Sequence, residues 1–216
     1  MQTRRRFLAA TGLAGISSLA GCLGFLTGTE PLTFAASPVS VSPDARSGTG
    51  YREVRVGPQT TTQTVTVAGQ TREVEVTNHA AQYDRELNLA VTSTRFASFV
   101  AFSTPRLSVA GQSLNPLAEL SNEEIANMVA EQANVQDLSR TGERSVPMLG
   151  TTATVVTYEG TATLGGVQAE VRVHLTDPVE AGDDLVLGLA VHPRQVDERA
   201  RVDRLLSGVT HAPESS

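Results

Sequence analysis

The stretch TVTVAGQTREVEV, residues 64–76, decides the fold class, because its side chains alternate between apolar and polar with a period of two. Val65 and Val67 alternate with threonines in the first half, and Val74 and Val76 alternate with glutamates in the second. Ala68-Gly69-Gln70 lies between the halves and carries the glycine that a tight chain reversal favours. The stretch therefore predicts a β-hairpin.

Downstream of the hairpin, the segment from Arg95 to Thr104 predicts a central strand. Its two faces are both apolar, with Phe96, Val100 and Phe102 on one and Ala97, Phe99 and Ala101 on the other. A strand with two apolar faces is expected to be covered on both sides. The other predicted strands are Val146–Met148, Thr151–Tyr158, Thr161–Thr163, Val167–Leu175 and Leu185–Val191, with Leu32–Phe34 as a short edge strand.

Two helices are predicted among these strands. The first runs from Leu117 to Ala133, where Ser121 and Glu124 have the spacing of a capping box. The second opens at Pro193 and runs to about Ser207. Its apolar stripe is predicted to consist of Val196, Ala200, Leu205 and Val209.

These elements predict an α+β fold, in which a curved antiparallel β-sheet carries a middle helix and a C-terminal helix packed on it. The predicted organisation is a signal peptide at residues 1–21, a flexible tether at 22–50 rich in Gly, Thr, Ser and Pro, a single domain at 51–211, and a disordered tail at 212–216.

The N-terminus matches an export signal. Residues 3–8 read TRRRFL, which fits the twin-arginine pattern S/T-R-R-x-F-L, with Arg4, Arg5, Phe7 and Leu8 at its defining positions. An apolar stretch follows from Phe7 to Ala20 and is too short to remain as a membrane-spanning helix. We therefore expect the twin-arginine translocase to export the chain in a folded state.

The apolar stretch ends in a lipobox, formed by Leu19, Ala20, Gly21 and Cys22. In such a motif the cysteine thiol becomes a thioether to lipid, and the chain is cut before the cysteine. The alternative is an ordinary anchor helix with a chance cysteine. The lipobox predicts a protein tethered by lipid on Cys22 to the extracytoplasmic side of the cell membrane. Firm attachment takes two hydrocarbon chains.

The charged residues indicate the surroundings of the protein. All 17 basic residues are arginine. Three of them precede Cys22 and all 23 acidic residues follow it, so the chain after the cysteine has 14 arginines and a net charge of −9. An acidic surface without lysine suits a halophilic archaeon, where salt screens like charges; a high-GC genome would also replace lysine by arginine. No basic stripe exists to bind nucleic acid.

No motif for catalysis or for a cofactor is found, so we expect no cofactor and favour a non-enzymatic protein over an enzyme. Cys22 is the single cysteine, which excludes an internal disulfide. His174 and His192 lie on strands that could be neighbours, with Glu170 on the same face as His174. They are weak candidates for a metal site, because a metal needs further converging ligands.

Several short motifs resemble one known family: FSTP at Phe102–Pro105, LNP at Leu114–Pro116, SNEE at Ser121–Glu124, the twin-arginine pair and the closing helix. Together they resemble a haloarchaeal lipoprotein family of unknown function that is exported by the twin-arginine route. The last 70 or so residues are also similar in fold to the PsbP-like superfamily, which includes extrinsic membrane-complex subunits and exported lipoproteins. Neither resemblance implies an activity.

The sequence therefore predicts an exported, membrane-anchored accessory domain that binds a protein partner at the cell surface. The alternative is a lipoprotein that carries a small molecule or a lipid in a cavity between the sheet and a helix. An enzyme would instead need a deep pocket with converging polar groups.

Overall fold

The computed structural model describes residues 31–67, 70–89, 92–106, 108–109, 112–113, 117, 120–164 and 167–212. These residues belong to two units. The smaller unit comprises residues up to Phe34 together with Thr61–Val76, and the larger unit comprises Ala35–Thr60 and everything from Thr77 onward.

The predicted hairpin is confirmed. It joins β3 (Arg52–Val67) to β4 (Gln70–Leu89), which are far longer than the valine pattern indicated. Near the turn, the hydroxyl oxygens of Thr66 and Thr71 lie 3.3 Å apart across the two strands. Val74 and Val76 are buried, as their alternation predicts. The short strand β1 (Leu32–Ala35) also pairs with β4.

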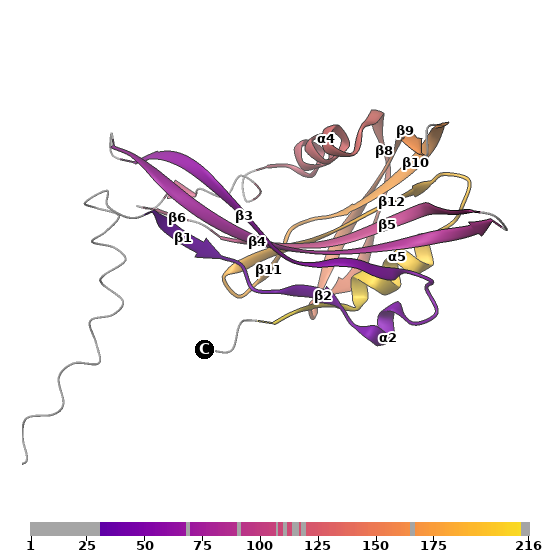
Figure 1. Ribbon diagram of the computed structural model, residues 1–216, viewed down its shortest axis with the longest axis horizontal. Coiled ribbons are helices and arrows are strands. Elements are labelled where there is room, and N and C mark those ends of the chain that lie inside the picture. Colours follow the sequence, from indigo (N-terminus) through magenta and orange to yellow (C-terminus); the bar gives the residue numbers. More distant parts are fainter. Residues whose placement is uncertain are drawn as a thin grey trace, which may run out of the picture. The chain divides into compact units, whose positions relative to one another are not determined.

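Nine strands form one sheet, whose main path has the order β1-β4-β5-β12-β10-β9-β8 (Figure 1). β3 is added on β4, and β11 on β12. The further bounds are β5 Thr92–Pro105, β8 Val135–Met148, β9 Thr151–Leu164, β10 Val167–Thr176, β11 Val179–Ala181 and β12 Asp184–Pro193. Two small sheets pair β2 (Val39–Val41) with β13 (Val209–His211), and β6 (Ser108–Val109) with β7 (Gln112–Ser113).

The central strand is confirmed as β5. It pairs antiparallel with β4 on one side and with β12 on the other. Ala97, Phe99 and Ala101 are almost fully buried on one face, and Phe102 packs against a second cluster on the other. Two apolar faces therefore correctly indicated an internal strand.

The helices are short: α2 spans Pro43–Arg46, α4 spans Asn122–Ala133 and α5 spans Arg199–Ser207. The capping box at the start of α4 is confirmed, since Ser121 and Glu124 bond each other's backbone N–H groups. The final helix was expected from Pro193, but Pro193 ends β12 and α5 begins six residues later. Its buried residues are Val202, Leu205 and Leu206, whereas Ala200 of the predicted stripe is exposed.

The expected α+β class is wrong. The protein is mostly β, with a large mixed sheet and three short helices among the described residues. The prediction failed because polar segments such as 136–145 show no apolar alternation, yet they are extended as part of β8. Backbone pairing with a neighbour can hold such a segment even where its side chains remain in water. Within the stretch expected as a tether, residues 32–46 contain β1, β2 and α2.

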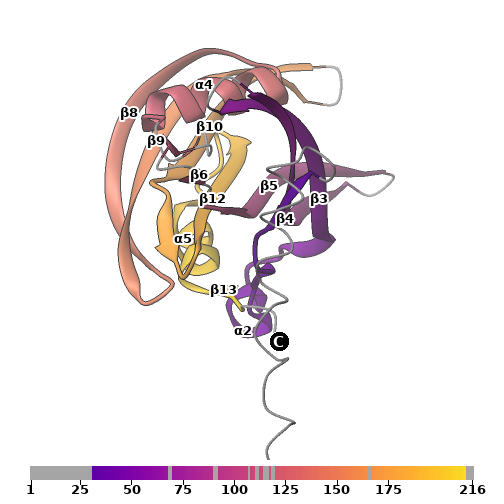
Figure 2. The same cartoon turned by 90° about the vertical axis from the view of Figure 1, so that its left-hand side faces the viewer.

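The larger unit buries both faces of its sheet. Leu205 and Leu206 of α5 pack in one cluster with Val155 of β9, and Ile125 of α4 packs in another with Val156. Adjacent residues of a strand point to opposite faces, so α5 and α4 cover opposite sides of these strands. Figure 2 shows β10 and β12 between the two helices.

Gly208 permits a close contact at the end of α5, and its replacement by alanine should destabilise the domain. A Cβ atom there would overlap the Cβ of Ala45 in α2, which cannot rotate away. We expect the free energy of unfolding to fall by about 1–3 kcal/mol, as overpacking usually does. Chemical denaturation of Gly208→Ala measures the loss. Gly142→Ala is the matched control, because its Cβ would meet no atom within 4 Å; equal losses in both variants would contradict the explanation.

Candidate functional site

His174 of β10 and His192 of β12 meet inside the larger unit. Both are almost completely buried, and their Nε2 atoms lie 3.1 Å apart. The neighbouring residues Val173 and Leu175 belong to the cluster that α4 covers. The alternation of a strand therefore points the His174 ring to the opposite face, where α5 lies.

The hydrogen bonds around the pair determine where the protons are. Arg144 of β8 donates from Nη1 to His174 Nδ1 over 3.1 Å, because a guanidinium can only donate. His174 therefore carries its proton on Nε2 and donates it to Nε2 of His192. His192 in turn donates from Nδ1 to the Pro193 carbonyl oxygen over 2.9 Å. The pair is a directional chain of two neutral rings.

The electrostatic environment keeps the rings neutral. Burial lowers the pKa of His174 to about 3, and the positive charge of Arg144 contributes in the same direction. Burial also lowers the pKa of His192, although its bond to the Pro193 carbonyl opposes the shift. Arg144 is itself paired with Asp203 of α5 at 2.6 Å. This series of hydrogen bonds therefore links β8, β10, β12 and α5 without a buried net charge.

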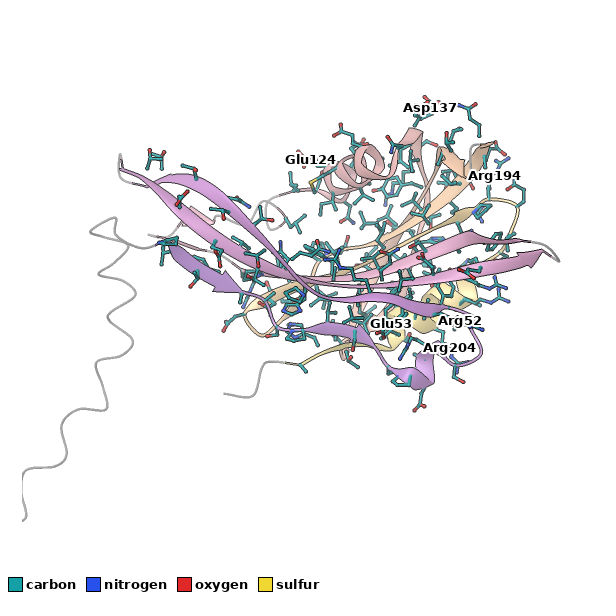
Figure 3. All side chains as sticks on the ribbon, viewed as in Figure 1. Arg52, Glu53, Glu124, Asp137, Arg194 and Arg204 are labelled. Atoms are coloured by element: carbon teal, nitrogen blue, oxygen red, sulfur yellow. The ribbon has the colours of Figure 1, made fainter. Side chains whose placement is uncertain are left out.

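The metal hypothesis for these histidines gains no third ligand. Glu170, which was expected on the same face as His174, pairs instead with Arg194 at 2.5 Å. Arg194 directly follows the end of β12 and is labelled in Figure 3. Arg144 places a positive charge where a cation would bind. Within the described ranges, no group of three or more His, Cys, Asp or Glu side chains lies close enough together to hold a metal ion.

A second polar cluster joins segments that are distant in sequence. Asp184, at the start of β12, is buried and accepts two hydrogen bonds at Oδ2. One comes from the backbone N–H of Ser37 over 2.7 Å, and the other from His211 Nε2 over 2.8 Å. Sequence reasoning did not predict this cluster, because nothing local marks residues 147 and 27 positions apart as partners.

A third cluster surrounds Glu198, the residue before α5, whose side chain is fully buried. Its Oε1 accepts from Arg85 of β4 and, over 3.2 Å, from Arg201 of α5. Burial and the nearby Glu198 carboxylate both raise the pKa of the Tyr51 phenol. Arg194, four residues before Glu198 in the sequence, pairs with Glu159 and Glu170 instead. The partner that matters most, Arg85, is 113 residues away.

The residues expected to act in export lie outside the described residues. They comprise the twin-arginine positions Arg4, Arg5, Phe7 and Leu8 and the lipobox Leu19, Ala20, Gly21 and Cys22. None of the helices in the described ranges has the length and hydropathy of a membrane-spanning segment.

The larger unit is thus mostly β, and its three polar clusters bond the buried side chains of His174, His192, Asp184 and Glu198 to other parts of the same chain. A family model described as a domain of unknown function, DUF6517, matches residues 38–210. The chain belongs to this family. No curated protein matches the chain.

Proposed function

We propose that this protein is a lipoprotein, exported by the twin-arginine translocase and tethered through Cys22 to the outer face of the cell membrane of a halophilic archaeon. The proposal is carried by one observation, the order and spacing of the RRRFL motif, a short apolar stretch and LAGC within residues 4–22. The net charge of −9 after Cys22 supports saline surroundings, where salt screens the repulsion. The likeness to a PsbP-like fold stays a prediction.

We further propose that the domain acts by binding a protein partner rather than by catalysis. The histidine chain and the Asp184 cluster use their polar atoms to join strands of the domain. Neither His174 nor His192 is exposed to solvent enough to meet a substrate. These observations support a structural role for groups that would otherwise be candidates for chemistry.

Replacing Cys22 by serine should release the protein from the membrane, because serine cannot form the thioether to lipid. We expect wild-type protein in the membrane pellet with the mass of a cut, lipidated chain, and Cys22→Ser protein without lipid and largely in the soluble fraction. Thr27→Ser, a substitution of similar size five residues later, is the control. A Cys22→Ser chain that stays equally firmly in the pellet would overturn the anchor.

Crosslinking in native membranes, followed by mass spectrometry, tests the partner. A protein partner predicts repeated recovery of a different chain in a fixed ratio. Recovery of this chain alone contradicts the proposal. Native mass spectrometry of the membrane-extracted protein tests the carrier alternative. A carrier would retain a bound small molecule or lipid, seen as mass beyond that of the lipid on Cys22.

A further inference from the structure

The two outer edges of the nine-stranded sheet differ in their chemistry. β8 lies at one end of the strand order, and β3 pairs with β4 alone among the described strands. Each therefore presents one row of backbone N–H and C=O groups without a strand beside it. Such an edge pairs readily with another chain unless charges, bulges or prolines oppose it.

The β8 edge carries all of these protective features. Asp137, Arg140 and Glu143 lie along it, and Asp137 lies at the outer rim of the larger unit (Figure 3). The register with β9 shifts twice, between residues 136 and 139 and between 140 and 142. Asp137 has a positive φ of 54°, which breaks the regular strand backbone. Another strand cannot pair with β8 over a long distance.

The β3 edge lacks this protection from Gly57 onward. No residue from Gly57 to Thr71 is charged, in a chain with 40 charged residues among 216. Pro58 is the single proline of β3, so the strand has backbone donors at each position from Gln59 to Val67. The side chains of residues 59–64 are exposed. Threonine and valine, which favour strands, make up seven of the nine positions from Gln59 to Val67.

We propose that the edge of β3 from Gln59 to Val67 pairs antiparallel with the same edge of a second copy of this chain. Two chains that each have a net charge of −9 after Cys22 repel each other, and contact through an uncharged strand brings the fewest like charges together. A basic partner would instead be attracted to the acidic surface. A twofold contact between identical strands also closes on itself, so it stops at a dimer.

The proposed pairing has a defined register. When residues 59–67 pair antiparallel with themselves, Gln63 lies on the twofold axis and faces Gln63 of the second copy. Opposite residues of antiparallel strands have Cα atoms about 4.5–5.5 Å apart. That separation is within the range a disulfide can bridge, about 4.4–6.8 Å. The contact does not depend on the lipid anchor.

A cysteine crosslink tests this register in the full chain. In a Cys22→Ser background, Gln63→Cys should form a disulfide-linked dimer under mild oxidation, visible on a non-reducing gel. Gln136→Cys is the matched control, because Gln136 is the same residue type and is exposed on β8. We expect it to remain monomeric. Equal crosslinking of both variants would contradict the proposal.

A charge placed on the twofold axis provides the second test. Gln63→Lys puts two ammonium groups opposite each other and should weaken dimerisation at least about tenfold, measured by light scattering of the full chain. Gln136→Lys should leave the dimer unchanged, and circular dichroism shows that both variants fold. A monomeric wild-type chain, or a dimer indifferent to Gln63→Lys, overturns the inference. Neither result bears on the membrane release of Cys22→Ser, so this inference and the proposed function can fail separately.

Discussion

Replacing Arg85 by alanine should lower the free energy of unfolding by about 3–5 kcal/mol, because it leaves the fully buried Glu198 carboxylate without its main partner. Arg201 remains, but it is partly exposed and bonds the carboxylate more weakly, at 3.2 Å. Arg85 also stacks on the Phe96 ring, with its guanidinium carbon 5.7 Å from the ring centre. Chemical denaturation of both proteins at neutral pH measures the difference.

Two further variants separate the charge effect from lost packing. In the double variant Arg85→Ala, Glu198→Leu the unpaired carboxylate is gone, so we expect it to be more stable than Arg85→Ala alone. Arg140→Ala removes the same side chain from an exposed pair with Glu143 and should change stability by less than about 1 kcal/mol. A double variant less stable than Arg85→Ala would show that packing of the arginine dominates.

The histidine chain should make the domain sensitive to mild acid. The pKa of His174 is about 3 in the folded protein, against an ordinary value of 6.5. Between these values the unfolded chain binds a proton that the folded chain excludes, so stability falls as the pH is lowered through 6.5. The expected loss from His174 is about 2 kcal/mol between pH 7 and pH 5. His192, whose pKa is also lowered, adds a loss of the same sign.

Denaturation curves at several pH values between 7 and 5 measure this slope, and a histidine variant identifies its source. His174→Gln cannot titrate, so its free energy of unfolding should change less over this range, whatever its value at pH 7. His192→Gln provides an independent variant should the first fail to fold. A slope that is the same in the wild type and in both variants would assign the acid sensitivity to other groups.

Local patterns in the sequence predicted local structure well. The alternating valines of residues 64–76 predicted the hairpin, and Ser121 with Glu124 predicted the capping box of α4. The helix itself was predicted from Leu117, but α4 begins at Asn122. The two apolar faces around Phe99 placed β5 inside the sheet. Each of these signals depends on residues a few positions apart, where backbone geometry alone relates side chains to one another.

Such patterns could not predict most of the contacts between residues that are distant in sequence. His174 and His192 were expected on neighbouring strands, but their bonds to Arg144 and Pro193 depend on the packing of β8 and the end of β12. The pairing of Glu198 with Arg85 had no local signal at all. The fold class was wrong for a related reason, since polar segments such as that of β8 become strands only through pairing with a neighbour.

If the proposed lipid on Cys22 anchors the chain, Asp184 also has a mechanical consequence. The Asp184 carboxylate accepts hydrogen bonds from both Ser37 and His211, and β2 pairs with β13 immediately beside them. Tension from the N-terminal side would first load β1, which pairs with β4, and only then the Asp184 bonds and the β2–β13 pair. A pull on that end therefore reaches the bonds of Asp184 only after β1 has separated from β4.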